Sequence, residues 1–114
     1  MSRYRKDLGD FGEAAAAAYL QKKQYQILEK NYRAAGGELD LIARTKTHLV
    51  FVEVKTRTTN DFGTPFEAIT KSKYENIKKG IQFYLQEHKF QKHRIDVIGI
   101  TLKPELKIEH LKNV

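Results

Sequence analysis

The sequence feature that most constrains the fold is a pair of β-type runs at residues 38–44 and 48–55, separated by a short polar turn. Apolar runs of this length on either side of such a turn predict the two strands of a hairpin. Side chains alternate between the two faces of a strand, and in the second run both faces are apolar before Glu53. We therefore expect a central strand that is covered on both sides of its sheet.

Two carboxylates interrupt these runs at positions where core residues are expected. A two-residue turn at residues 46–47 would place Asp40 directly opposite Glu53, within about 5 Å at Cβ. A three-residue turn would instead place Asp40 opposite Val52, and the acids would then face opposite sides unless a bulge restored the alternation. In a covered strand, the Glu53 carboxylate requires compensation by a cation or by a dense hydrogen-bond network.

The pattern leaves two interpretations of this acidic pair open. In the first, Asp40 and Glu53 are hard oxygen ligands of Mg²⁺ or Mn²⁺. Lys55 lies on the same face as Glu53, where its ammonium group could steady a scissile phosphate or orient an attacking water. In the second interpretation the three residues form an ion-pair cluster without chemistry, which is the more common case for an arbitrary hairpin.

Composition excludes several classes of protein. A chain of 114 residues builds a single core, so residues 1–114 are expected to form one domain. No apolar run approaches the roughly 18 residues of a membrane span, and the amino terminus lacks the apolar core of a signal peptide. The absence of cysteine excludes disulfides, thiolate zinc sites and thiol nucleophiles. We expect a cytoplasmic protein with no membrane partner.

Positive charge is concentrated between Lys71 and Arg94. The chain carries a formal charge of +7, and this stretch holds seven Lys and Arg against two Glu, a difference of +5. A polyanion is the natural partner, because Lys and Arg contacts to phosphates dominate affinity for nucleic acids. A diffuse basic surface also serves solubility alone, and charge by itself leaves both readings open.

The remaining elements are predicted from periodicity. The alanine run 14–18 and the apolar spacing around it predict a helix over residues 7–23, and residues 25–31 predict a strand. A second helix is expected over residues 70–87, capped either by Thr70 or by Ser72. Residues 94–102 and 107–111 predict two further strands. The order is helix, three strands, helix, two strands.

Glu13 and Asp96 are further candidate acids. Helical spacing places Glu13 on a stripe of small and apolar residues, from which it either approaches the acidic pair or acts as a first-turn acid opposite the helix dipole. Asp96 lies in an apolar run and is most simply explained by pairing with Arg94 or Lys92. The histidines show no metal-ligand spacing, so metal-assisted hydrolysis is the only chemistry whose parts are all present.

The spacing of Glu13, residues 37–40 and residues 53–55 resembles that of the restriction-endonuclease-like PD-(D/E)XK superfamily. Over nearly its whole length the chain resembles the small bacterial YraN-like family, whose core is similar to that of archaeal Holliday-junction resolvases. The matching stretches are GDFGE at 9–13, YQIL at 25–28, NYR at 31–33, GELDLIA at 37–43, VFVEVKTR at 50–57, FGTP at 62–65 and RIDV at 94–97. No proline precedes Asp40 here, but that proline is dispensable across the superfamily.

The resemblance implies an α/β fold with a restriction-endonuclease-like core, in which helices flank a central mixed five-stranded sheet in the order α-β-β-β-α-β-β. It implies that Asp40, Glu53 and the Val54 carbonyl bind Mg²⁺ or Mn²⁺. Lys55 would orient or activate water, and Glu13 would complete the acidic site.

The leading hypothesis is a Mg²⁺-dependent nuclease that hydrolyses phosphodiester bonds in DNA, including branched or damaged DNA. DNA is favoured over RNA, and a homodimer is compatible with the sequence. The alternatives are a noncatalytic nucleic-acid-binding module on the same scaffold and a protein-interaction adaptor. The residues expected to contact the nucleic-acid backbone are Arg33, Arg57, Lys71, Lys73, Lys78 and Lys79.

Overall fold

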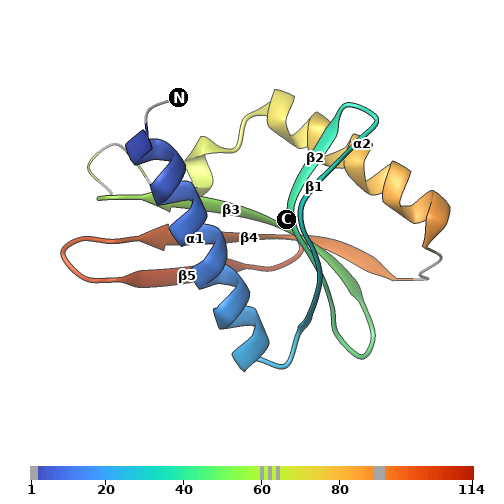
Figure 1. Ribbon diagram of the computed structural model, residues 1–114, viewed down its shortest axis with the longest axis horizontal. Helices are drawn as coiled ribbons and strands as arrows, with labels where there is room; N and C mark the ends of the chain where they lie inside the picture. Colours follow the sequence, from blue (N-terminus) through green and yellow to red (C-terminus); the bar gives the residue numbers. More distant parts are fainter. Residues whose placement is uncertain (1–2, 60, 62, 64, 89–91) are drawn as a thin grey trace.

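The computed structural model describes residues 3–59, 61, 63, 65–88 and 92–114. In chain order the elements are α1 (Arg3–Lys22), β1 (Gln26–Ala34), β2 (Gly37–Arg44), β3 (Leu49–Arg57), the 3₁₀ helix η1 (Pro65–Ala68), α2 (Lys71–Glu87), β4 (His93–Thr101) and β5 (Lys107–Leu111). Figure 1 shows their arrangement. The predicted α-β-β-β-α-β-β order is confirmed, and η1 is a short addition between β3 and α2.

The strands form one mixed sheet in the order β1-β2-β3-β4-β5. The β1–β2, β2–β3 and β4–β5 pairs are antiparallel, whereas β3 and β4 are parallel. Parallel neighbours need a long crossover connection, which α2 and η1 provide here. β3 is therefore the central strand, as its two apolar faces predicted.

The two helices cover opposite faces of this sheet. Val50, Val52 and Val54 of β3 belong to a buried cluster that includes residues of α1. Leu49 and Phe51 belong to a second cluster with residues of α2. In Figure 1, α1 lies across β3, β4 and β5, while α2 runs beside the hairpin of β1 and β2. The alternation predicted for β3 is confirmed, and Glu53 accordingly belongs to the face covered by α2.

The starts of the two helices decide between alternatives that the sequence left open. α1 begins at Arg3, one turn before the predicted start, so Glu13 lies in the third turn and is not a first-turn acid. α2 is capped by Thr70, whose Oγ1 accepts a hydrogen bond from the Lys73 amide at 3.1 Å. Thr70 and not Ser72 is therefore the cap.

A glycine contact fixes the position of the β1–β2 hairpin against α2. A Cβ atom added to Gly37 would lie 2.1 Å from the amide nitrogen of Gly80, so only glycine permits this approach of β2 to the helix. The first residues of β2, which lead to Asp40, are thereby held beside the middle of α2. Among the described residues, no helix has the length and hydropathy needed to cross a membrane.

Candidate active site

The register of the β2–β3 hairpin brings the two predicted acids together. Arg44 pairs with Leu49 and Leu41 with Val52, and the Thr45 amide donates to the His48 carbonyl at 2.9 Å. This is the register of the two-residue turn. The printed pairs end at Leu41 and Val52, so Asp40 and Glu53 are the next residues along the two strands.

Asp40 lies where β2 and β3 begin to separate. The backbone pairing of the two strands ends at Leu41 and Val52, and Asp40 Oδ2 instead accepts a hydrogen bond from the Val54 amide at 2.9 Å. Asp40 is 9% exposed and Glu53 is 3% exposed. Burial raises the pKa of Glu53 to about 7, and the neighbouring charge of Asp40 adds to this increase. The pair is therefore a buried acidic site with a strong requirement for positive charge.

Two lysines approach the buried oxygen of Glu53. Lys73 Nζ lies 2.6 Å from Glu53 Oε1, and Lys55 Nζ lies 4.0 Å from the same atom. The Lys73 ammonium group supplies positive charge to Glu53 Oε1, and no other described residue donates a hydrogen bond to this buried oxygen. Glu53 Oε1 therefore depends on a cation for its compensation.

Lys55 has an altered proton affinity. Burial lowers the pKa of Lys55 to about 8, and the contact with Lys73 contributes to the decrease, while the charges of Glu53 and Asp40 oppose it. A lysine with a pKa this close to neutrality can exchange a proton with a bound water or hydroxyl group. The position predicted for Lys55, on the same face as Glu53, is confirmed by their ion-pair contact.

Glu13 approaches the site from the opposite face of the sheet. Burial raises the pKa of Glu13, and the negative charge of Asp40 raises it further, whereas a hydrogen bond with Asn31 opposes the increase. Glu13 therefore lies within electrostatic range of Asp40. Within the part of the chain that the structure describes, however, no three His, Asp or Glu side chains are placed to hold one metal ion.

Asp40 and Lys73 both line two neighbouring hollows. One is a cavity of about 260 Å³ beside the first turns of α2, whose lining includes Glu53, Lys73 and Asn76. The other is a groove of about 850 Å³ along the first half of α1 and the end of β3. The charged residues that line the groove are Arg5, Glu13, Asp40, Lys55, Arg57 and Lys73.

The residues expected to contact nucleic acid lie in several places. Arg57 lines the groove beside the acidic pair. Lys71, Lys78 and Lys79 are exposed on α2, and Lys78 lies over the Tyr74 ring with Nζ 5.1 Å from its centroid. Arg33 is exposed and lies 3.5 Å from Glu38.

Lys73 differs from the other lysines of α2 because it faces the sheet. The buried residues of α2 include Ile77, Gly80 and Tyr84. Intervals of four, three and four residues place Lys73 on the same stripe, one turn before Ile77. In the sequence analysis, charge alone grouped Lys73 with its exposed neighbours.

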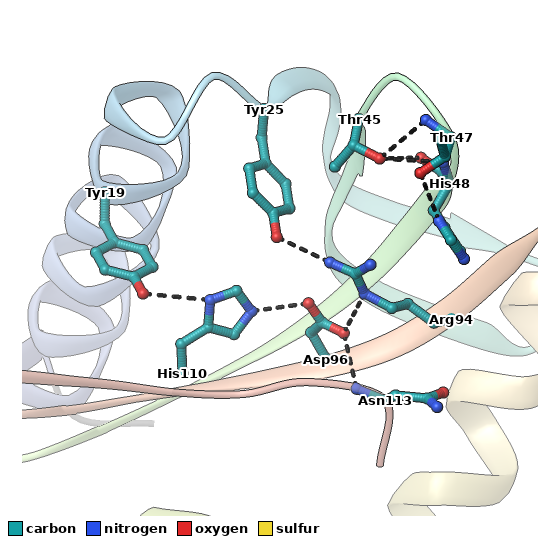
Figure 2. Close-up of polar contacts among 9 residues, drawn as sticks. All are labelled: Tyr19, Tyr25, Thr45, Thr47, His48, Arg94, Asp96, His110 and Asn113. Atoms are coloured by element: carbon teal, nitrogen blue, oxygen red, sulfur yellow. Dashed lines mark hydrogen bonds and ion pairs between the residues drawn. The ribbon is translucent and has the colours of Figure 1, made fainter.

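Asp96 belongs to a separate network on the other face of the sheet. Its fully buried carboxylate accepts from Arg94 Nε at 3.0 Å and from the Asn113 amide at 3.0 Å, and lies 2.7 Å from His110 Nε2. Tyr19 and Tyr25 extend the network through His110 and Arg94, as Figure 2 shows. The predicted pairing with Arg94 is confirmed. Asp96 pairs with Val52 in register, on the face opposite Glu53.

Comparison with known proteins gives one family. A family model described as "Uncharacterised protein family UPF0102" matches residues 12–100. A UPF0102 protein of Caldanaerobacter subterraneus subsp. tengcongensis is 45% identical over 115 residues, which covers 96% of this chain and 94% of that protein. A UPF0102 protein of Geobacter metallireducens is 42% identical over 116 residues, with 99% and 95% covered. With most of its length matched, the chain belongs to the UPF0102 family.

Proposed function

We propose that this protein is a divalent-metal-dependent nuclease that hydrolyses phosphodiester bonds in DNA, with branched or damaged DNA as the favoured substrate. The observation that carries the proposal is the convergence of Asp40 and Glu53, with Lys55 beside them, at the edge of a groove lined by basic residues. The resemblance of these residues and their spacing to the PD-(D/E)XK superfamily supports the same function.

The donors at the acidic pair fit Mg²⁺ or Mn²⁺. Mg²⁺ commonly binds through one or two carboxylates and keeps several waters, so a third carboxylate in direct contact is not required. Asp40, Glu53 and the Val54 carbonyl would hold the ion, and Glu13 would contribute through its charge near Asp40. The buried oxygen Glu53 Oε1, whose nearest cation among the described residues is the Lys73 ammonium group, would contact the ion. When bound, the ion would polarise a phosphoryl oxygen and increase the acidity of water.

The chain itself would supply positioning and proton transfer. The Lys55 ammonium would hold a non-bridging oxygen of the scissile phosphate or orient the attacking water. Since the pKa of Lys55 is lowered to about 8, a fraction of the amine is neutral near physiological pH and can accept a proton from that water. Burial of the acidic pair excludes bulk water, which strengthens each of these electrostatic contacts.

The backbone of the nucleic acid would follow the basic side chains around the acidic pair. Arg57 in the groove would contact phosphates next to the scissile bond. Lys71, Lys78 and Lys79 on the exposed side of α2 would contact more distant phosphates, and Arg33 would do so from β1. Each phosphate neutralised contributes about one unit to the salt slope of binding, so affinity should fall steeply with ionic strength.

A noncatalytic nucleic-acid-binding module is the second candidate, and one observation favours it. Lys73 already supplies positive charge to Glu53 at 2.6 Å, and the described residues contain no group of three ligands for a metal ion. A protein that uses these charges only to stabilise its fold would bind nucleic acid through the same basic surface without cutting it.

Cleavage assays separate the two candidates. Labelled linear, flapped and four-way DNA, together with RNA, are incubated with Mg²⁺ or Mn²⁺ and with EDTA. The nuclease predicts metal-dependent cuts in DNA that Asp40→Ala, Glu53→Ala and Lys55→Ala abolish. Glu105→Ala, which removes an exposed carboxylate from the β4–β5 connection, is the matched control and should cut normally. Binding of all substrates without any cut would favour the noncatalytic module.

A further inference from the structure

Lys73 supplies a positive charge beside the buried carboxylate of Glu53. Its Nζ lies 2.6 Å from Glu53 Oε1, the buried oxygen that has no other close donor among the described residues. At this distance the two side chains form an ion pair, in which Lys73 supplies the positive charge. Because the fold holds the Lys73 ammonium group against a buried acid, its role differs from that of the exposed lysines of α2.

The position of Lys73 on α2 explains why this contact forms. It lies on the inward-facing stripe of the helix, one turn before the buried Ile77, and its amide donates to the Thr70 cap. The backbone of Lys73 is thus fixed in the first turn of α2. Its side chain alone determines whether the ammonium group contacts Glu53.

The side chain of Lys73 also has a route away from Glu53. It is 38% exposed, whereas the side chain of Glu53 is 2% exposed. Lys73 lines both the small cavity and the larger groove, so its ammonium group can leave the carboxylate for solvent without any backbone movement. The flexible four-carbon side chain of lysine makes such a change of position easy.

We propose that Lys73 is the resident cation of the Asp40–Glu53 pair and that a divalent metal ion binds by displacing the Lys73 ammonium group from Glu53. This inference rests on the metal site of the proposed function. An ammonium group at 2.6 Å and a divalent ion cannot both contact Glu53 Oε1, because two cations at such separations repel each other strongly in a buried site. The acidic pair therefore exchanges one positive partner for another and is compensated in both states.

Displacement has a consequence for the substrate. The freed ammonium group remains tethered to the first turn of α2, at the junction of the cavity and the groove. There it becomes available to a phosphate oxygen of the polyanion only after the metal ion has bound. Lys73 thus acts as a positioning residue whose contact with nucleic acid depends on the metal ion.

Amine labelling of the unmodified protein tests displacement directly. An acylating reagent is added in EDTA or in saturating Mn²⁺, and the modified lysines are quantified by peptide mass spectrometry. We expect labelling of Lys73 to rise several-fold in Mn²⁺, while Lys79, which is exposed on the same helix, stays constant and serves as the internal reference. Unchanged or reduced labelling of Lys73 in Mn²⁺ would overturn the inference.

A second test measures Mn²⁺ affinity by titration calorimetry and does not depend on catalytic activity. The variants are Lys73→Met, Lys73→Arg and Lys79→Met. Removal of the competing charge in Lys73→Met should tighten Mn²⁺ binding about tenfold, the equivalent of 1.4 kcal/mol. Lys73→Arg and Lys79→Met should stay within about twofold of the wild type. Equal Mn²⁺ affinity in Lys73→Met and wild type would overturn displacement while leaving the nuclease proposal intact. Absence of Mn²⁺ binding in every variant would overturn both.

Discussion

The proton affinity of Glu53 gives a prediction whose size follows from the structure. Its folded-state pKa of about 7 lies above the ordinary value of 4.5, because the carboxyl is buried and faces Asp40. Between these pH values the folded state holds a proton that the unfolded chain has released. The resulting stabilisation is fully present below pH 4.5 and is lost as pH rises through about 7. A difference of about 2.5 pH units at 1.36 kcal/mol per unit gives about 3 kcal/mol.

The perturbation that isolates this contribution is Glu53→Gln, which keeps the shape of the side chain but cannot titrate. Free energies of unfolding are measured by urea denaturation in EDTA, followed by circular dichroism, between about pH 4 and pH 8. We expect wild type to lose about 3 kcal/mol relative to Glu53→Gln over this range.

The control for this experiment is Glu38→Gln, which removes an exposed carboxylate on the same strand and should change the pH profile by less than about 1 kcal/mol. Parallel profiles for wild type and Glu53→Gln would refute the argument that burial beside Asp40 controls Glu53.

Two further predictions concern stability. Asp96→Ala removes the shared acceptor of Arg94 and His110 and should lower the free energy of unfolding by about 3 to 5 kcal/mol, because it leaves a buried cation without its partner; a loss below about 1 kcal/mol in urea denaturation would contradict this role. Gly37→Ala places a methyl group against the backbone of α2 and should destabilise by about 3 kcal/mol in the same assay. Gly9→Ala, where a Cβ meets nothing within 4 Å, should be neutral or stabilising.

Much of the fold could be predicted because its signals are local. The two apolar faces of β3 followed from the alternation of side chains. The length of the β2–β3 turn had two alternatives, and the structure has the two-residue turn at residues 46–47. The start of α1 was less predictable, because Arg3–Lys6 carries no apolar pattern. That early start also removes the explanation of Glu13 as a first-turn acid.

Contacts between residues on elements that are distant in sequence could not be predicted in the same way. The pairing of Asp96 with Arg94, two residues away, was predicted, but its contact with His110 depends on the pairing of β4 with β5 and on the packing of α1 over both. Lys73 was grouped with the exposed lysines because no local pattern states which residue an inward-facing lysine meets.

The sequence by itself determined the order of the elements and the central position of β3, and it limited the β2–β3 turn to two alternatives. These features depend on periods of two and 3.6 residues and on turn length, all of which act between near neighbours. Only the tertiary structure decided that Lys73 lies on Glu53, that Glu13 approaches Asp40 from the other face, and that Asp96 belongs to a separate network. Each of these contacts joins different elements, so it exists only once those elements have packed together.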